Sequence, residues 1–172
     1  MAAVRLRRAG VADAAAIAAL QVRAWQWAYR GLMPDAFLDT LSVTARELRW
    51  RAQLADEDPL HTFVAERDGV IVGFVSCGPA ADGSLPAGTG ELFALYQEAR
   101  VVHSGVGRAL LAHAERVLSA RGFPAALLWV LEGNARARCF YERAGWEPDG
   151  TVVVETRADH QRRQLRYRKT LG

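Results

Sequence analysis

The chain has 172 residues, of which 51% are hydrophobic and 24% charged, and its formal net charge is +3. This length suits one domain around one core, so we predict a single domain over residues 1–172. No run of about 18 apolar residues occurs and the charged start "MAAVRLRRAG" is unlike a signal region, so we expect no membrane association and a cytoplasmic location. Cys77 and Cys139 stand far apart without a C-x-x-C motif, which gives no support for a disulfide framework or a metal site.

The positive charge is carried almost wholly by arginine, with Lys169 as the one lysine of the sequence. Arginine-rich surfaces can attract anions such as phosphates. No long basic run occurs, and the densest cluster, 162–169, alternates in the way that suits a solvated strand face. This pattern disfavours nucleic acid as a partner.

The first half of the chain predicts a strand, helices and a hairpin. In order, we expect a strand at 4–8, a helix from Val11 to about Tyr29 with Asp13 in its first turn, a short helical piece after Pro34, a second full helix ending near Leu54, a hairpin over 61–78 and a loop over 79–89. Thr44 and Glu47 have the spacing of a capping box and would begin the second full helix. Asp68-Gly69 suits the positive φ angles of a type I′ turn in the hairpin.

The second half alternates apolar strands with helices. We expect central strands at 90–97 and 125–131, a helix from Gly105 to Gly122, a helix over 134–145, and a final antiparallel pair at 151–157 and 162–171. Both central strands are apolar on both faces, as expected of strands that are covered on each side.

The segment "VVHSGVGRALL" places Gly105 and Gly107 where a strand gives way to a helix. The first turn of a helix presents unpaired N–H groups and the positive end of the helix dipole, and glycine lets an anion approach the backbone closely. The alternative is that the glycines only relieve crowding at a helix start. Neither the Walker pattern nor the dinucleotide fingerprint is present.

The segment "NARARCFYERAGW" carries three polar residues at helical spacing. Asn134, Arg138 and Tyr141 stand at i, i+4 and i+7, which puts them along one side of a helix. This set forms either a binding face or an ordinary polar face with Asn134 as the N-cap.

Taken together, "ELFALYQEARVVHSGVGRALL" and "LWVLEGNARARCFYERAGW" resemble the GNAT superfamily of N-acetyltransferases, which transfer an acetyl group from acetyl-CoA to an amine. The resemblance covers essentially the whole chain. It implies an α/β (α+β) fold: a mixed, mostly antiparallel sheet of about seven strands with a splayed parallel pair, flanked by about four helices. It also implies acetyl-CoA as the cofactor and a possible homodimer.

The resemblance assigns residues to the cofactor by position. Backbone contacts with the acetyl and pantetheine arm fall on Leu95, Tyr96 and Gln97; the pyrophosphate falls on Val102, His103, Ser104, Gly105, Val106, Gly107 and Arg108; Asn134 and Arg138 complete the cofactor set. Val102 departs from the usual Gln or Arg and removes one polar anchor, and Gln97 stands where an apolar residue is usual. Backbone N–H groups would still hold the anion.

For the chemistry, Tyr141 is the expected general acid, because a phenol with an ordinary pKa near 10 is protonated at neutral pH and can protonate a leaving thiolate. Glu91 could accept the amine proton through water, or could simply be a strand-edge carboxylate paired with an arginine. The resemblance implies that the region of Trp25 and Tyr29 walls the acceptor site; the alternative is that these aromatics belong to the core. The resemblance adds the last hairpin, where Glu155 or Asp159 could attract an ammonium group.

The resemblance therefore implies an N-acetyltransferase, and we expect it to act on a primary amine of a small molecule by direct attack in a ternary complex. Two other functions stay open. The acceptor could be a protein or aminoacyl-tRNA amine, or the chain could be a non-catalytic CoA-binding domain.

Overall fold

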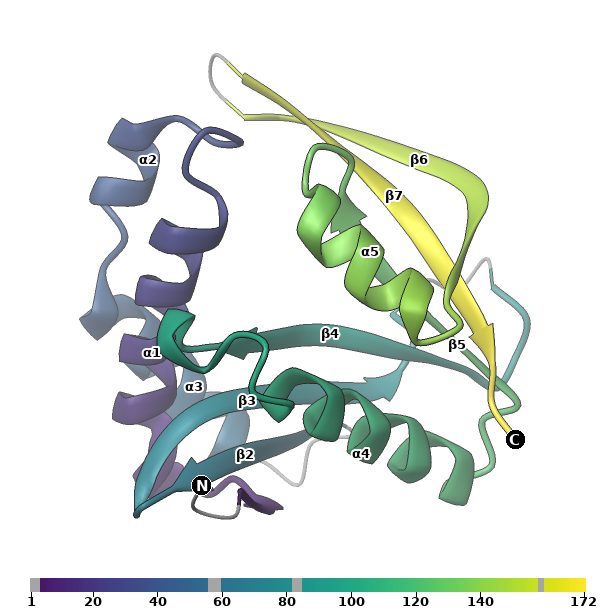
Figure 1. Ribbon diagram of the computed structural model, residues 1–172, viewed down its shortest axis with the longest axis horizontal. Coiled ribbons are helices and arrows are strands. Elements are labelled where there is room, and N and C mark those ends of the chain that lie inside the picture. Colours follow the sequence, from purple (N-terminus) through teal and green to yellow (C-terminus); the bar gives the residue numbers. More distant parts are fainter. Residues whose placement is uncertain (1–3, 56–59, 82–84, 158–159) are drawn as a thin grey trace.

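The computed structural model describes residues 4–55, 60–81, 85–157 and 160–172 (Figure 1). Its elements are β1 (Arg5–Arg8), α1 (Ala14–Ala28), α2 (Asp35–Asp39), α3 (Val43–Ala55), β2 (His61–Arg67), β3 (Val70–Pro79), β4 (Thr89–Gln97), α4 (Val106–Ala120), β5 (Ala125–Leu131), α5 (Ala135–Arg143), β6 (Glu147–Arg157) and β7 (His160–Thr170). Short 3₁₀ turns, Val11–Asp13 and Ala99–Val101, precede α1 and α4. None of the helices within these ranges is long and apolar enough to cross a membrane.

The seven strands form one sheet in the order β1-β2-β3-β4-β5-β7-β6. Every neighbouring pair is antiparallel except β4 and β5, which run parallel. This confirms the predicted mixed sheet with one parallel pair. The described part of the chain has five α-helices where about four were expected, the additional one being the short α2.

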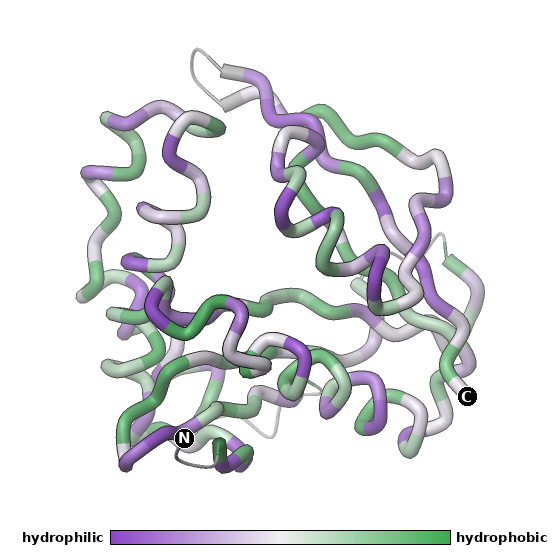
Figure 2. Tube along the Cα trace, viewed as in Figure 1, coloured by the Kyte–Doolittle hydropathy of each residue, from purple (hydrophilic) through white to green (hydrophobic). Residues whose placement is uncertain are grey.

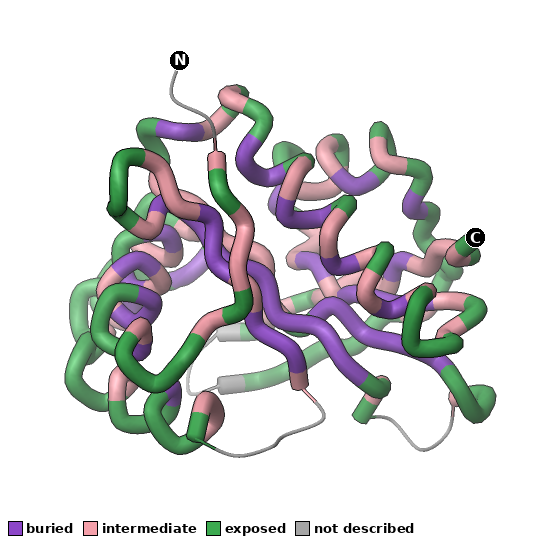
Figure 3. The backbone as a smooth tube through the Cα atoms, turned by 90° about the horizontal axis from the view of Figure 1, so that it is seen from below, coloured by how far each residue is buried: buried purple, intermediate pink, exposed green. Residues whose placement is uncertain are grey.

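Helices cover both faces of the sheet. On one face, α1 and α3 pack on β2 and β3 through a cluster that includes Ile17, Leu20, Trp50 and Phe74. On the other face, α4 packs on β3, β4 and β5 through a larger cluster that also takes in Tyr141 and Trp146. Hydrophobic residues run along the central strands (Figure 2), which are the most buried part of the chain (Figure 3).

The parallel pair opens after only four residue pairs. β4 and β5 are paired from Thr89–Ala125 to Leu92–Leu128, and beyond this point the two strands diverge (Figure 1). The divergence coincides with a bulge in β4, because Ser76 of β3 pairs with Ala94 while Cys77 pairs with Leu92. The bulge residue Phe93 therefore has no partner on β3, and it is 38% exposed.

The bulge also changes which face each β4 side chain occupies. Leu92 and Leu95, three apart, both pack in the α4 cluster, whereas Ala94 and Tyr96 pack against the α1 and α3 cluster. Without the extra residue, a strand would place Leu92 and Leu95 on opposite faces. The bulge thus allows β4 to turn away from β5 while side chains on both of its faces still pack against helices.

Two local expectations can be compared with the structure. Asp68 and Gly69 have φ angles of 53° and 75°, as the type I′ turn required. The capping box at Thr44 and Glu47 is wrong. The Ser42 hydroxyl instead accepts a hydrogen bond from the N–H of Ala45 at 3.1 Å, and Glu47 pairs with Arg51 one turn later. Ser42 offered the same chemistry two residues earlier, and the helix begins there.

Candidate active site

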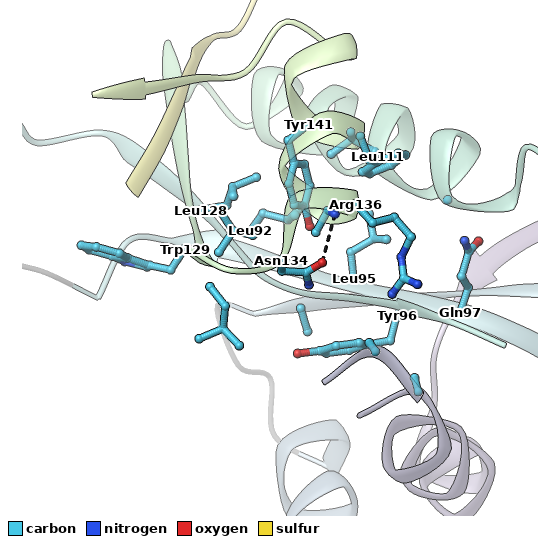
Figure 4. A pocket seen from close by; sticks show the side chains of 18 of the residues that line it. Leu92, Leu95, Tyr96, Gln97, Leu111, Leu128, Trp129, Asn134, Arg136 and Tyr141 are labelled. Atoms are coloured by element: carbon cyan, nitrogen blue, oxygen red, sulfur yellow. Dashed lines mark hydrogen bonds between the residues drawn. The ribbon is translucent and has the colours of Figure 1, made fainter. Parts of the chain in front are cut away.

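A cavity of about 770 Å³ fills the gap between the diverging strands (Figure 4). It is bounded by β4 and β5, by the loop before α4, by α5 and by the C-terminal part of α1. Most of the residues predicted for the site line it: Trp25, Tyr29, Glu91, Leu95, Tyr96, Gln97, Val102, His103, Gly105, Gly107, Arg108, Asn134 and Tyr141. Four others do not line it: Ser104, Val106, Arg138 and Glu155.

The loop before α4 presents a group of unpaired backbone donors. In the described chain, the N–H groups of His103, Gly105, Val106, Gly107 and Arg108 have no backbone partner, and the first helical bond runs from Ala109 N–H to Gly105 C=O. Because these donors lie at the positive end of the α4 dipole, this end of the cavity suits an anion.

Two residues of this loop have left-handed backbone angles. Gly105, the N-cap of α4, has φ of 89°, and a Cβ there would meet no atom within 4 Å. His103 has φ of 66°. Gly105 is therefore needed for the turn itself. Gly107 has a different role, since a Cβ there would lie 3.3 Å from Gln97 Oε1. A side chain at Gly107 would therefore crowd Gln97, whereas the space beside the backbone of Gly105 is open.

The edge of β4 also faces the gap. Glu98 N–H donates to Val72 C=O on β3 at 2.9 Å, and successive backbone groups of a strand point to opposite edges. The backbone groups of Gln97 and Leu95 therefore point toward the side that β5 has left. This edge can hydrogen-bond an extended amide-containing chain.

Tyr141 lies at the centre of the cavity wall, on α5 (Figure 4). Its residue is 9% exposed, and its ring contacts Phe140 and Trp146. Among the described residues its hydroxyl has no hydrogen-bond partner, so the proton is free for another molecule. Burial raises the pKa of Tyr141 above its ordinary value, so the hydroxyl is protonated at neutral pH.

Asn134 fixes the start of α5. Its Oδ1 accepts a hydrogen bond from Ala137 N–H at 3.1 Å (Figure 4), so Asn134 is the N-cap of α5. The side chain is also buried and lines the cavity, so the capping role and a contact with a ligand are compatible.

Aromatic side chains from α1 and β4 wall the opposite side. The hydroxyls of Tyr29 and Tyr96 are hydrogen-bonded at 3.1 Å, and Trp25 packs edge-on against Tyr29 with ring centroids 5.1 Å apart. Burial raises the pKa of both tyrosines, so they are neutral donors and acceptors. Trp25 and Tyr29 therefore do both: they pack against Tyr96 of β4 and they line the cavity.

Glu91 precedes the bulge, on the β4 segment that still pairs with β5. It is 9% exposed, lines the cavity, and its Oε2 accepts a hydrogen bond from Ala81 N–H at 3.3 Å. A buried carboxylate in this position can take up a proton from a molecule inside the cavity.

Arg138 is turned away from the cavity, contrary to the predicted common face. Its Nε donates to Tyr167 Oη and its Nη1 to the carbonyl of Glu132, both at 3.1 Å. The helical spacing correctly predicted the position of the Arg138 Cα relative to Asn134 and Tyr141. The long side chain, however, turns to acceptors on Tyr167 and Glu132.

Ser104, Val106 and Glu155 also lie outside the cavity wall. Val106 is fully buried in the core, and the Ser104 hydroxyl donates to Val101 C=O. Glu155 on β6 accepts a hydrogen bond from Arg162 at 2.8 Å, so its charge is not directed at a ligand as expected. Asp159, the other residue expected to attract an ammonium group, lies outside the described residues.

Sequence reasoning missed several residues of the wall. Arg136 of α5 places its guanidinium 3.8 Å from the ring centroid of Trp27 on α1, which joins the two sides of the gap. Trp129 of β5 and Arg162 of β7 also line the cavity. A tryptophan two residues after Trp25 and an arginine inside "NARAR" were visible in the sequence, but nothing local signalled that Trp27 and Arg136 meet.

The residues present fit coenzyme A. The cavity offers unpaired N–H groups and Arg108 at the α4 end for a pyrophosphate, and an open strand edge for an amide-containing arm. Val102 lines the cavity without adding a polar anchor, as predicted. Within the described residues no cluster of His, Cys, Asp and Glu could hold a metal ion.

Comparison with known proteins assigns the chain to a family. The model of the Acetyltransferase (GNAT) family matches residues 15–146. The chain is 32% identical over 132 residues to the uncharacterized N-acetyltransferase YuaI of Bacillus subtilis (strain 168), a match that covers 76% of this chain and 73% of that protein.

Two further similarities are informative. A mycothiol acetyltransferase of Acidothermus cellulolyticus is 36% identical over 123 residues, and the match covers 66% of this chain and 38% of that longer protein. A PaiA N-acetyltransferase of Thermoplasma acidophilum, solved in complex with coenzyme A, has the same fold with a TM-score of 0.74 at 17% identity, covering 98% of this chain and 99% of that one. With the splayed strands and the matched segments, these findings show that the chain belongs to the GNAT family of acetyltransferases and is an acyltransferase that uses acetyl-CoA.

Proposed function

We propose that this protein transfers the acetyl group of acetyl-CoA to a primary amine of a small molecule, by direct attack within a ternary complex. The observation that carries the proposal is the position of Tyr141. It holds a protonated hydroxyl in the cavity wall between the anion-binding loop before α4 and the aromatic wall of Trp25, Tyr29 and Tyr96.

The donor side would use the backbone. The N–H groups from His103 to Arg108 would bind the pyrophosphate, and the edge of β4 at Leu95 and Gln97 would bind the pantetheine arm. Asn134 would add one side-chain contact at the start of α5. Because backbone groups do most of this work, Val102 lowers affinity without removing the site.

The chemistry divides between two side chains. Bound acetyl-CoA supplies a thioester, in which the amine nitrogen forms a C–N bond as the C–S bond breaks, and the proton lost by the amine is matched by one gained by the sulfur. Tyr141 would deliver its proton from Oη, and a raised pKa keeps that proton in place until it is needed. Glu91 would take up the amine proton through water.

The shape of the acceptor side favours a small molecule. Arg136 and Trp27 meet across the gap, and Tyr29 and Tyr96 are joined by a hydrogen bond, so side chains from α1, β4 and α5 narrow the acceptor side. A protein or tRNA acceptor would need an open groove. The similarity to a mycothiol acetyltransferase supports the same choice.

Thermal unfolding with and without acetyl-CoA tests the proposal, with ATP as the control anion. Ligand at about 100 times its Kd adds roughly 2.7 kcal/mol to the free energy of unfolding, which raises Tm by about 5 to 10 °C for a chain of this size. A rise that is specific to acetyl-CoA, followed by thiol release with small amines, is the expected result. No rise, or an equal rise with ATP, would contradict it.

A further inference from the structure

Arg162 is an unusually buried cation in the wall of the cavity. Its side chain is 10% exposed and it lines the cavity from β7. One nitrogen, Nη2, donates to Glu155 Oε2 at 2.8 Å. Its Nε is buried and has no hydrogen-bond partner in the described structure. Burying a donor without an acceptor is unfavourable, so this guanidinium is incompletely satisfied.

The strand register directs Arg162 toward the acceptor side. Gln164, two residues later on the same face of β7, pairs with Leu131 at the end of β5, so Arg162 lies just beyond the point where β5 stops. Gln164 and Arg162 both line the cavity. Tyr29, at the end of α1, lines the same cavity.

The charges of the cavity wall are unbalanced. Among the described residues that line it, Arg108, Arg136, Arg143 and Arg162 are cationic, and Glu91 is the one carboxylate. Arg108 stands at the loop that suits a pyrophosphate, and Arg136 lies over Trp27. Arg162 belongs neither to the loop that suits a pyrophosphate nor to a contact with an aromatic ring. Its partner Glu155 is 45% exposed and accepts a hydrogen bond from Nη2 alone.

Apolar side chains also line this cavity. Trp129, Met33 and Phe93 line the cavity near the end of β5, the α1–α2 connection and the bulge. A molecule bound here would place an apolar body among these side chains and an acceptor group against Arg162. The complement of an arginine edge is a carboxylate, which can accept two parallel hydrogen bonds.

We propose that the acceptor is an amine that also carries a carboxylate, of the amino-acid type with an apolar side chain, and that Arg162 binds this carboxylate. The inference rests on the proposed function, since it names the class of acceptor for the same site. It differs from the expectation of an ammonium-binding hairpin, because the buried charge that the described part of this hairpin presents to the cavity is positive.

The test compares matched amines with and without the carboxylate. The pairs are L-phenylalanine with phenethylamine, L-tryptophan with tryptamine, and L-methionine with 3-(methylthio)propylamine, each followed by thiol release from acetyl-CoA. The wild-type protein is expected to have a kcat/KM about 10- to 100-fold higher for the carboxylate member of at least one pair, because hydrogen bonds to charged groups have this effect.

Variants assign the effect to the side chain. Arg162→Gln should remove the preference by lowering kcat/KM for the carboxylate member alone. Arg162→Lys should retain part of the preference, because lysine keeps the positive charge but cannot donate two parallel hydrogen bonds to a carboxylate. Arg163→Gln is the matched control: Arg163 is the next residue, is 51% exposed and pairs with Glu132 outside the cavity wall.

A second readout does not depend on turnover. N-acetyl-L-phenylalanine should raise the Tm of the wild-type protein and of Arg163→Gln more than N-acetylphenethylamine does, and this difference should vanish in Arg162→Gln. A thermal unfolding transition without ligand shows that each variant is folded. If Arg162→Gln does not fold, the comparison is made with Arg162→Lys instead.

The outcomes separate the two proposals. Equal use of both members of every pair, transfer only to the decarboxylated amines, or an unchanged preference in Arg162→Gln would overturn the role of Arg162. Transfer to none of these amines would also overturn it. In each case acetyl-CoA would still stabilise the protein, whereas failure of acetyl-CoA to bind would overturn the proposed function itself.

Discussion

Removing the hydroxyl of Tyr141 should lower kcat strongly while the free energy of unfolding hardly changes. In Tyr141→Phe the ring keeps its contacts with Phe140, at a centroid distance of 5.2 Å, and with Trp146, at 6.3 Å. The hydroxyl has no partner among the described residues, so its removal leaves no buried group unsatisfied. The free energy of unfolding should therefore change by less than about 1 kcal/mol.

The same change should have a large effect on turnover. A positioned general acid contributes about 10²- to 10⁴-fold, which corresponds to roughly 2.7 to 5.4 kcal/mol of activation free energy. We expect kcat to fall by this factor with little change in the affinity for acetyl-CoA. The assay is steady-state thiol release at saturating acetyl-CoA, beside binding of acetyl-CoA measured by calorimetry.

Tyr167→Phe is the matched control. Tyr167 is fully buried on β7, where its hydroxyl accepts a hydrogen bond from Arg138 at 3.1 Å and donates to Glu142 at 2.7 Å. Its removal should lower the free energy of unfolding by about 1–3 kcal/mol and leave kcat nearly unchanged. An unchanged kcat in Tyr141→Phe, or equal losses of kcat in both variants, would refute the reasoning.

Four further outcomes follow from the structure. Because burial raises the pKa of Tyr141, kcat should show no alkaline decline up to about pH 10, and a decline that Tyr141→Phe abolishes near pH 8 would contradict this. In Glu91→Gln the acidic limb of the pH–rate profile should disappear, and a retained wild-type limb would exclude Glu91 as the base. Gly105→Ala places a residue at φ of 89°, which should cost about 1–2 kcal/mol in a denaturant titration and raise the KM for acetyl-CoA, whereas an unchanged KM would argue against this loop as the anion site. Hydrogen bonds from Arg7 hold the pKa of Asp13 below its ordinary value, so this pair stabilises the fold above about pH 4 and the contribution is lost as the pH falls further; Asp13→Asn should flatten the acid side of a stability curve, and an unchanged curve would remove the pair from this role.

Local patterns determined most of the elements. Alternating and helical spacings gave the central strands at 90–97 and 125–131 and the helix after Gly105, since each buries a continuous apolar face. Turn chemistry gave the Asp68-Gly69 hairpin, because positive φ angles are a property of two adjacent residues. The helix start at Ser42 was missed because Thr44 offered a similar cap close by.

The segments that we propose for coenzyme A could be predicted from sequence because backbone groups would make most of their contacts. A loop and a helix start determine where N–H groups are left unpaired, and Gly105 marks that place in a linear pattern. Asn134 and Tyr141 were predicted from one helix for the same reason, since the two residues belong to one rigid element.

What the sequence by itself determined, then, is the order of the elements, the family and the backbone that suits coenzyme A. Only the tertiary structure decided which side chains meet across the gap. Arg138 turns to Tyr167, and Arg162 enters the cavity beyond the end of β5. Long, flexible side chains follow partners that are distant in sequence, and a one-dimensional pattern records only where such a side chain is attached.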